Sequence, residues 1–450
     1  MTSKNTIVLI TLCFMLAGFI VQGHAYDLYD RVGIASSPNP VGSGARAIGM
    51  GGAFIGIADD ATAASWNPAG LIQLEKSELS IVGAYNVRTE DYASSTNPEA
   101  DNTSTIDETN LNYLSATLPF NLLKRNMVVS VNYQRLYEFK RELEYDLTLS
   151  TPSIPPLSSE QNRNYEMDGY LGALGVAYTA EITPRLSIGG TLNVWTDDLF
   201  WQNGWKENFK SHSDTTFGAS HVLEDTDITE TYKDFSGVNV NIGIMWNVFR
   251  NFTIGAVIKT PFTASVKKKY SEDWVQKDAT TGAIIDSDKI RDSEDIDVDM
   301  PISYGLGLAW RVSDRFSLDL DVYRTEWSDY VITDSAGNKT AGIGGRADKD
   351  SDVDDTTQVR FGGEYLIIRP DQSMVIPIRG GIFYDPEPTY DGKNDFYGIS
   401  LGSGIGYKRF IFDIAYQLRW GRDVETDNLI ANSEADVTQH TVLLSVIYHF

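Results

Sequence analysis

The feature that most constrains this chain is a two-residue alternation of apolar and polar side chains, which recurs in segment after segment. The residues that share one face of the last segment are Val442, Leu444, Val446, Tyr448 and Phe450. Successive side chains of a β-strand point to opposite faces, so this period indicates strands with one apolar face. Acidic residues such as Asp319, Asp321 and Asp413 fall on the other face. Together these patterns predict an all-β fold, a transmembrane antiparallel β-barrel with lipid outside and a polar lumen.

The first 25 residues are typical of a cleaved secretory signal peptide. Lys4 gives a positive start, residues 7–21 form an uncharged apolar run, and Ala25 ends a small-residue cleavage site. An uncleaved membrane anchor is the alternative, but the run is short for a span of about 20 residues. The one cysteine, Cys13, lies in this segment. The exported chain is therefore expected to lack disulfides, thiolate metal sites and a cysteine nucleophile.

Composition narrows the possible partners. The formal net charge of −25 argues against nucleic acid. The 23 tyrosines suit the aromatic girdles of an outer-membrane barrel. The mean hydropathy of −0.23 is compatible with a barrel, because only alternate residues face lipid.

The connections between alternating segments differ in length. The segments expected to be long polar loops lie near 88–108, 139–163, 197–230, 271–299, 328–355, 385–395 and 421–436. The connections expected to be short turns lie at 121–126, 182–184, 247–251, 313–315, 369–372 and 408–409. Short turns on one side and long loops on the other predict about fourteen strands with extracellular loops.

Residues 26–75 do not alternate and are rich in Gly and Ala. Small residues permit close backbone packing, and a barrel of this width has a lumen to fill. We therefore expect a hatch, or plug, over 26–75 inside a barrel over 76–450.

The hatch segment also carries a recognisable motif. It runs from Gly44 to Phe54 (Gly-Ala-Arg-Ala-Ile-Gly-Met-Gly-Gly-Ala-Phe) and continues to Trp66-Asn67-Pro68-Ala69-Gly70-Leu71. Three further stretches match in character: 259–262, 300–307 running on to 326–330, and 379–388. Over nearly the whole exported chain the sequence resembles the FadL family of outer-membrane transporters for long-chain fatty acids and hydrocarbons.

This resemblance implies a fourteen-stranded barrel with an N-terminal hatch, and it implies gating by the Asn67-Pro68-Ala69 core of the hatch motif. Pro68 fixes its own backbone and restricts Asn67. The family's lateral exit is associated with a kinked third strand. Here that strand, 127–139, has neither Gly nor Pro, whereas Pro261 predicts a break in the seventh strand.

Four lumen residues are candidates for ligand binding: Arg46, Arg360, Arg379 and Phe383. A cation in a low-dielectric lumen needs a partner. One interpretation is a structural network in which Glu364, Asp319, Asp321 and Asp413 balance the arginines. The other is a site where an arginine receives a ligand carboxylate at the end of an apolar pocket.

Other motifs carry no chemistry. The glycines at 42, 44 and 49 lack the spacing and the Lys-Ser/Thr of a phosphate loop. The histidines form no metal-ligand spacing and no nucleophile elbow is present, so no cofactor, metal or catalytic residue is expected. The carboxylates at 348, 350, 352, 354 and 355 suggest either hydrated loops or weak divalent-cation binding at the lipopolysaccharide surface.

The predicted function is a passive outer-membrane channel for hydrophobic small molecules, long-chain fatty acids first, and not an enzyme. Its expected partners are that ligand, outer-membrane lipid and lipopolysaccharide; whether a protein partner exists is left open. The alternatives are a secretion-system component or surface scaffold of the same fold, and a general porin. A pocket of roughly 300–1,000 Å³ between hatch and wall would distinguish a transporter from a filled scaffold.

Overall fold

Antiparallel strands pair in chain order around a closed barrel, because β1 (Glu78–Ser94) pairs with β2 (Asn102–Leu122) on one side and β22 (Ser433–His449) on the other. The computed structural model describes residues 42–152, 154–196, 202–343, 353–389, 392–426, 430 and 432–450. The predicted signal peptide, 1–25, and the first part of the predicted hatch lie outside these ranges.

The remaining strands of the wall are β3 (Arg125–Glu138), β4 (Arg141–Thr151), β5 (Leu157–Thr183), β6 (Leu186–Trp195), β7 (Gly204–Phe217), β8 (Ser220–Phe249), β9 (Phe252–Lys259), β10 (Phe262–Asp278), β11 (Ile284–Met300), β12 (Ser303–Ser313), β13 (Phe316–Thr325), β14 (Val331–Thr333), β15 (Lys339–Ala341), β16 (Thr356–Arg369), β17 (Met374–Tyr384), β20 (Phe396–Tyr407) and β21 (Phe410–Glu425). Several of these continue one another along the wall: β3 with β4, β6 with β7, β9 with β10, and β11 with β12. The barrel therefore has 14 strands, as predicted.

Burial along the strands confirms the predicted faces. In β22 the outward Leu444 is 56% exposed, whereas its neighbour Leu443 is 4% exposed. Asp319, Asp321 and Asp413 are all buried on the lumen side. Apolar side chains thus cover the outer wall where lipid replaces water, and polar side chains face the interior.

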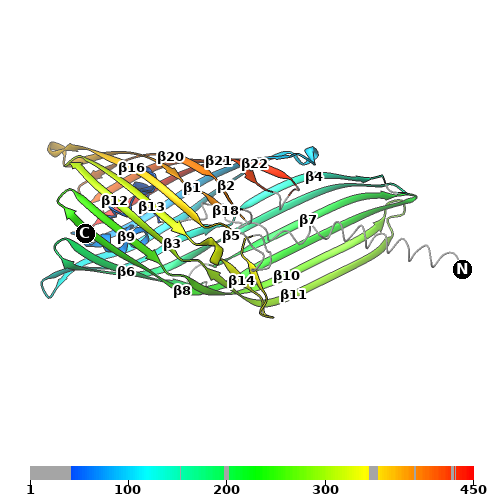
Figure 1. Cartoon of the computed structure of the whole chain (residues 1–450), viewed down its shortest axis with the longest axis horizontal. Helices are drawn as coiled ribbons and strands as arrows, with labels where there is room; N and C mark the ends of the chain where they lie inside the picture. Colours follow the sequence, from blue (N-terminus) through cyan, green and yellow to red (C-terminus); the bar gives the residue numbers. More distant parts are fainter. Residues whose placement is uncertain are drawn as a thin grey trace.

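The predicted long loops at 88–108, 139–163, 197–230 and 271–299 are wrong, since most of these residues extend the strands. β8 alone has 30 residues, whereas a membrane crossing takes about 9–11. The excess forms a sheet that projects from one part of the barrel rim, where β4, β7, β10 and β11 reach far beyond the other strands (Figure 1). Backbone pairing continues there beyond the apolar outer face of the barrel.

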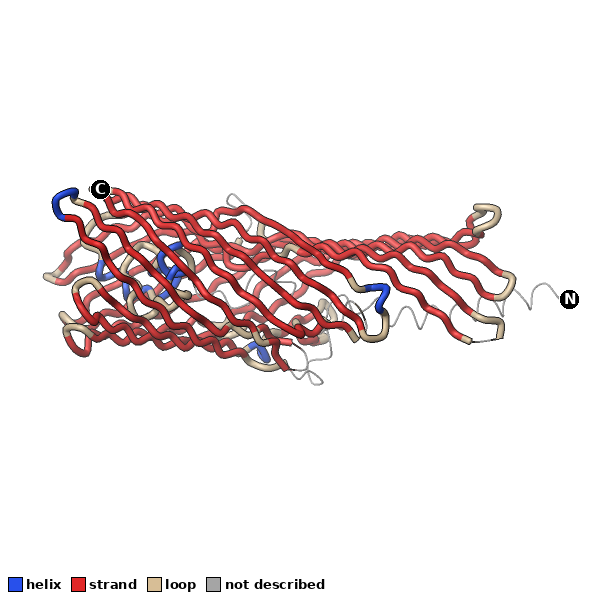
Figure 2. Tube along the Cα trace, turned by 90° about the horizontal axis from the view of Figure 1, so that it is seen from above, coloured by secondary structure: helices blue, strands red, loops and turns tan. Residues whose placement is uncertain are grey.

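Both sides of this projecting sheet lack a paired strand along most of their length, although the side chains of Asn102 and Ser104 donate to carbonyl oxygens of β4. The sheet consists of the outer parts of β4, β5, β7, β8, β10 and β11. Among the described residues, β4 pairs only with β5, and β11 pairs on its far side only through 297–299 with β14. The view from above shows the same projection on one side of the barrel (Figure 2).

Two strand breaks lie near the membrane level. Pro261 separates β9 from β10, as predicted. The third strand is also irregular, although it has neither Gly nor Pro: its register to β5 shifts between Arg135 and Tyr137. The shift lies opposite Gly172 of β5, where a Cβ would lie 2.9 Å from the Tyr133 ring.

Short elements complete the described chain. They are α2 (Ala45–Gly49), α3 (Ala63–Trp66), η2 (Pro68–Gln73), η3 (Pro98–Ala100), η4 (Trp327–Asp329), η6 (Pro370–Gln372), and the hairpin of β18 (Glu387–Thr389) and β19 (Gly392–Asn394). No helix in the described ranges is both long enough and apolar enough to span a bilayer. The first three of these elements lie inside the barrel (Figure 2).

Candidate functional site

The hatch segment, which we define as residues 42–77, packs inside the barrel against strands on opposite sides of the wall. Helix α2 contacts β20, β21 and β22, whereas η2 contacts β5, β6 and β8. Its apolar core includes Phe54 and Trp66, whose rings meet edge to face at 5.9 Å. The segment therefore closes much of the lumen.

Glycines of the wall make this close packing possible. A Cβ on Gly189 would lie 2.5 Å from the carbonyl carbon of Pro68, and one on Gly243 would lie 2.1 Å from Asn67 Oδ1. On the opposite side, a Cβ on Gly362 would lie 2.0 Å from the Met50 carbonyl oxygen. The hatch backbone thus lies directly on the barrel backbone at both sides.

The predicted gating residues lie at one of these contacts. The Asn67 amide donates to the carbonyl oxygens of Ile55 at 3.0 Å and Ile244 at 3.1 Å, and its Oδ1 accepts from the Ala69 N–H. Pro68 begins η2, where a missing N–H is harmless. Asn67 therefore joins two hatch turns to strand β8.

Wall hydroxyls hold the same turn from outside. Thr179 donates to the Pro68 carbonyl oxygen, and Ser187 donates to the Ala69 carbonyl oxygen at 3.0 Å. All three predicted gating residues are thus brought together on the β5–β6–β8 side of the lumen. Their role in gating stays a prediction.

Arg46 and Arg379 belong to a chain of buried ion pairs. Arg379 contacts Glu364 at 2.6 Å and Asp413 at 2.5 Å. Arg46, on hatch helix α2, contacts the same Glu364 at 3.0 Å and Asp59 at 2.6 Å. This geometry matches the structural network described above, and it links the hatch to β16, β17 and β21.

Arg360 and Phe383 lie together farther along the wall. The Arg360 guanidinium is 5.0 Å from the centroid of the Phe383 ring, donates to the Gly51 carbonyl oxygen at 3.0 Å, and lies 3.5 Å from Asp385. A ligand carboxylate would have to compete with these contacts. Ligand binding by Arg46, Arg360, Arg379 and Phe383 therefore stays a prediction.

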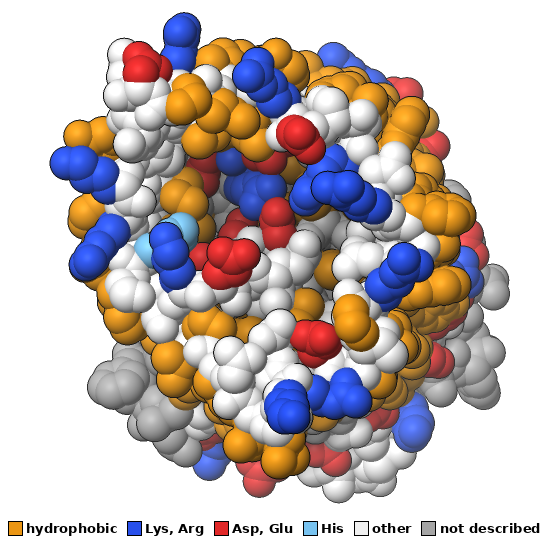
Figure 3. Space-filling view, turned by 90° about the vertical axis from the view of Figure 1, so that its left-hand side faces the viewer, with side chains coloured by type: hydrophobic (Ala, Val, Ile, Leu, Met, Phe, Trp, Pro, Cys, Tyr) orange, Lys and Arg blue, Asp and Glu red, His pale blue; other side chains and the backbone are white. Residues whose placement is uncertain are grey.

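Charged side chains of both signs gather inside the barrel mouth at the end where the C-terminus lies (Figure 3). That face is hollowed, and hydrophobic side chains surround the hollow. Asp319 and Asp321 are used differently from the predicted network: Asp321 accepts from the N–H groups of Phe54 at 2.7 Å and Ile55 at 2.8 Å. It thus anchors the hatch backbone.

A pocket lies on the lumen side of the wall, at the two proline breaks Thr260-Pro261 and Pro301-Ile302, and no described residue of the hatch segment lines it. Its free space is about 40 Å³, room for a few water molecules at most. Its apolar lining consists of Leu136, Tyr137, Trp195, Phe262, Met300 and Pro301. The Trp195 and Phe262 rings stack at 5.5 Å, so the pocket offers flat apolar surfaces.

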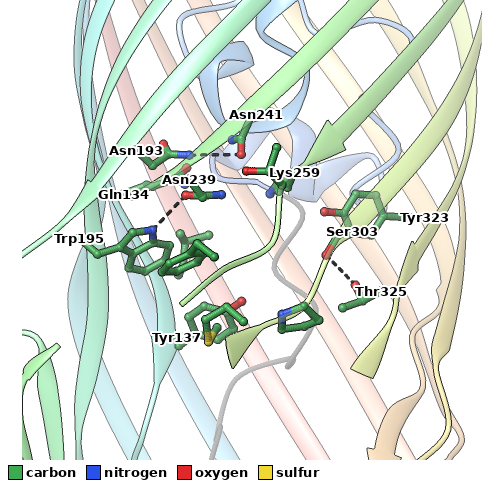
Figure 4. Close-up of a pocket in the computed structure, with 15 residues that line it drawn as sticks. Gln134, Tyr137, Asn193, Trp195, Asn239, Asn241, Lys259, Ser303, Tyr323 and Thr325 are labelled. Atoms are coloured by element: carbon green, nitrogen blue, oxygen red, sulfur yellow. Dashed lines mark hydrogen bonds between the residues drawn. The ribbon is translucent and has the colours of Figure 1, made fainter. Parts of the chain in front are cut away.

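The other wall of this pocket is polar. Its residues are Gln134, Asn193, Asn239, Asn241, Lys259, Thr260, Ser303, Tyr323 and Thr325. Asn193 donates to Asn241 at 3.2 Å and Trp195 donates to Asn239 at 3.0 Å, whereas Ser303 and Thr325 pair at 3.1 Å on the opposite side of the pocket (Figure 4). The pocket is therefore amphipathic.

The two-residue alternation places Asn193, Trp195, Asn239 and Asn241 on the lumen face but predicts no role for them. The signal available was their run of amides on adjacent strands. Their meeting with Lys259 and Tyr323 depends on the strand breaks, which alternation does not reveal.

A second, smaller cavity of about 20 Å³ lies where β2 and β3 separate. Among the described residues, their pairing stops at Tyr113 and Gln134. Its lining residues are Asn86, Arg88, Ile106, Asp107, Glu108, Glu138, Lys140 and Gln439. Backbone pairing is interrupted here, and side chains bridge the gap: Arg135 pairs with Glu108, and Asn110 donates to Glu138 at 2.8 Å.

The acidic cluster gives no metal site in the described part of the chain. Residues 348, 350 and 352 lie outside it, and Asp355 pairs with Arg324 at 2.7 Å. No group of three or more His, Cys, Asp or Glu side chains there is placed to hold a metal ion.

Comparison with known proteins gives one family. The family model described as outer membrane protein transport protein (OMPP1/FadL/TodX) matches residues 41–426. Among proteins of curated function, no sequence matches.

Solved structures share the fold. A FadL homologue from Pseudomonas aeruginosa has a TM-score of 0.58 at 14% identity, over 91% of this chain and 98% of that one. The toluene transporter TodX of Pseudomonas putida has a TM-score of 0.53 at 13% identity, over 91% and 98%. CymD, a monoaromatic hydrocarbon channel, has a TM-score of 0.51 at 14% identity, over 92% and 98%.

Proposed function

Because the chain belongs to the OMPP1/FadL/TodX family of outer membrane transport proteins, we propose that it takes up long-chain fatty acids passively through a hatch-gated barrel. The protein is an outer-membrane channel for hydrophobic compounds, in a family of transporters rather than enzymes. The choice of fatty acids over aromatic hydrocarbons is ours.

The single observation that supports transport is the family match over residues 41–426. The pocket has about 40 Å³ of free space, below the roughly 300–1,000 Å³ of small-molecule sites, so a ligand would have to spread its lining side chains to enter. A general porin would need an open, wet lumen, which the hatch segment obstructs.

The driving force for capture is desolvation. Lipopolysaccharide slows greasy molecules that a phospholipid bilayer would admit, whereas an apolar pocket gains about 0.8 kcal/mol for each CH₂ removed from water. Transport then follows the ligand gradient. The Trp195 and Phe262 rings supply the first apolar contact.

We assign 1–25 to an export signal, 26–75 to the hatch and 76–450 to the barrel. In this proposal the hatch moves to release the ligand, and Asn67, Pro68 and Ala69 form the hinge contact with β8. The interruption of backbone pairing between β2 and β3 is the proposed exit toward the membrane.

The test is oleate uptake by cells that rely on this protein. Asn67→Ala and Pro68→Ala should impair uptake while leaving the folded barrel at normal surface abundance. Unchanged uptake by both variants would contradict a gating role.

A second pair of variants tests the pocket itself. Ser303→Phe places a ring in the pocket and should reduce uptake, whereas Ser313→Phe, at the exposed end of the same strand, should not. Equal uptake by both variants would remove the pocket from the route.

A further inference from the structure

The short turns at the C-terminal end of the barrel carry an excess of basic side chains. These six turns connect β2 to β3, β5 to β6, β8 to β9, β12 to β13, β16 to β17 and β20 to β21. Each has at least one lysine or arginine within three residues of it. We call these nine residues the basic ring: Lys124, Arg125, Arg185, Arg250, Arg311, Arg315, Arg369, Lys408 and Arg409.

This end of the molecule differs in charge from the rest of the chain. The same stretches contain three acidic residues, Glu181, Asp314 and Asp371, against the nine basic ones. The whole chain has the opposite balance, with 62 acidic against 37 basic residues. Figure 3 looks onto this end and shows lysine and arginine side chains on all sides of the rim.

The charges of the basic ring are not neutralised within the described part of the chain. All nine residues are exposed, and none forms an ion pair with another described residue. Arg125 donates to the carbonyl oxygens of Glu181 and Ile182, and the Lys408 ammonium lies 4.9 Å from the centroid of the Tyr407 ring. Neither contact supplies a negative charge, so the ring is free to attract an external anion.

An aromatic belt on the outer wall lies next to the basic ring. Its members are between 43% and 65% exposed and lie near the ends of the strands that enter or leave these turns: Tyr178, Trp246, Phe249, Trp310, Tyr365, Tyr407 and Phe410. Such rings mark the level at which hydrocarbon meets headgroups in a membrane barrel. The basic ring lies just beyond that level, where the lipid phosphates lie.

From this arrangement we infer that the basic ring binds the anionic headgroups of the phospholipid leaflet around the turn end of the barrel. The long connections are expected to be extracellular, so this leaflet is the periplasmic one. Lysine and arginine suit such a position, because their long stems cover apolar surface while their charged ends reach the headgroups. The inference goes beyond the proposed function and does not depend on which ligand is transported.

The distribution of the basic residues favours a lipid leaflet over a soluble acidic protein. A protein partner would contact a patch on one side of the rim, whereas the basic residues occur at all six turns of a closed wall. Only a partner that surrounds the barrel can meet them all. A membrane leaflet surrounds it by necessity.

The test compares two lipids as quenchers of tryptophan fluorescence, with the purified full-length protein in phosphatidylcholine vesicles. Brominated phosphatidylglycerol and brominated phosphatidylcholine both reach the outward Trp246 and Trp310. The wild type should prefer phosphatidylglycerol at least about threefold, because each basic side chain near the surface attracts anionic lipid. The preference should disappear at about 1 M salt, where exposed charges are screened.

The decisive variant replaces one arginine on each of four turns: Arg185→Gln, Arg250→Gln, Arg315→Gln and Arg409→Gln. It should lower the preference for phosphatidylglycerol at least about twofold. The corresponding four-lysine variant keeps the charge and should keep the preference. If the four-glutamine protein fails to form the barrel, the pair at 185 and 250 and the pair at 315 and 409 are measured separately, each with about half the effect.

The matched control removes the same charge from the projecting sheet. It combines Lys210→Gln, Lys277→Gln, Lys289→Gln and Arg291→Gln, which lie on β7, β10 and β11. Its lipid preference should equal that of the wild type.

Two results would overturn the inference without affecting the proposed transport function. Equal quenching of the wild type by both lipids would mean that the basic ring does not bind lipid, and would leave a soluble acidic partner as its ligand. An equal loss of preference in the control would mean that total charge, and not the ring, selects the lipid.

Discussion

Single residues in this lumen are arranged to neutralise buried charge. Glu364 lies between two arginines, Arg46 of the hatch and Arg379 of the wall, and Asp413 balances Arg379 from the other side. A buried charge is tolerated only when it is paired. The same residues therefore bear on stability as well as on the position of the hatch.

Arg379→Ala should destabilise the barrel, because Asp413 and Glu364 both lose a buried partner. Breaking a buried pair costs about 3–5 kcal/mol, and the double variant Arg379→Met with Asp413→Asn should recover part of this loss. Urea unfolding followed by the heat-dependent gel shift of the folded barrel measures both effects. A loss of affinity confined to fatty acids, with matched alkanes unaffected, would instead make Arg379 a ligand-binding residue.

Glu207, on β7 in the projecting sheet, should give that sheet a pH-dependent stability. Burial, together with the nearby Glu230, raises the pKa of Glu207 to about 7 from an ordinary 4.5, against bonds from Trp205 and Tyr165 and the charge of Lys268. The folded sheet therefore holds this proton more tightly than the unfolded chain does. The stabilisation that comes from this tighter proton binding by Glu207 is present below pH 4.5 and is lost as pH rises through 7.

The matching variant is Glu207→Gln, which keeps the shape without the charge. At pH 8 it should stabilise β7 and β8 by up to roughly 3 kcal/mol, and at pH 4 it should change nothing. Amide hydrogen exchange of these two strands at both pH values measures this. A gain of equal size at both pH values would refute the assignment of the effect to ionisation.

At the scale of elements, the hatch and the wall meet backbone to backbone. Strand β6 shows that this contact leaves no space for a side chain, because one of two adjacent glycines lies against the hatch and the other does not. A Cβ on Gly189 would clash with Pro68, whereas one on Gly190 would lie 3.8 Å from its nearest neighbour.

Gly189→Ala should therefore loosen η2, whereas Gly190→Ala should be tolerated. Overpacking of this kind costs about 1–3 kcal/mol. Hydrogen exchange in residues 63–73 should rise for the first variant only, with the barrel strands unchanged. Equal exchange in both variants would mean that the hatch is not in contact with β6 in solution.

The strands were predictable because alternation is a local property of the sequence. The period of two alone assigns Leu444 and Leu443 to opposite faces, and Pro261 marks a break. The extent of the strands could not be predicted, because residues 271–299 pair without any apolar face. The pocket could not be predicted from the sequence, because Asn193, Asn241 and Gln134 are brought together by strand pairing and by the register shift near Leu136, which no Gly or Pro in that strand marks.

At the scale of the whole molecule, closure of the barrel depends on one seam between β1 and β22. The outward Phe450 extends this seam: its N–H donates to the Ser77 carbonyl oxygen at 3.1 Å, and its ring stacks on Tyr448 at 6.2 Å. The seam is long, with 17 residue pairs in register from Glu78 to Ser94.

Deleting Phe450 should reduce assembly into the outer membrane while export to the periplasm continues. The deletion removes both the last seam hydrogen bond and an apolar anchor on the lipid side. The amount of heat-modifiable barrel in membrane fractions reports assembly. Normal amounts in the deletion strain would show that the remaining seam is sufficient.

Because the wall projects on one side only, we expect the molecule to unfold in two stages on heating. Within the bilayer no water competes for backbone hydrogen bonds, so the closed cylinder cannot fray strand by strand. The sheet above it ends in two edges, β4 and β11, that lack a paired strand along most of their length, so water competes there for the edge bonds. On heating, the projecting sheet should therefore unfold from its edge strands well before the barrel unfolds. This first step should be reversible, and the barrel should stay inserted in the membrane.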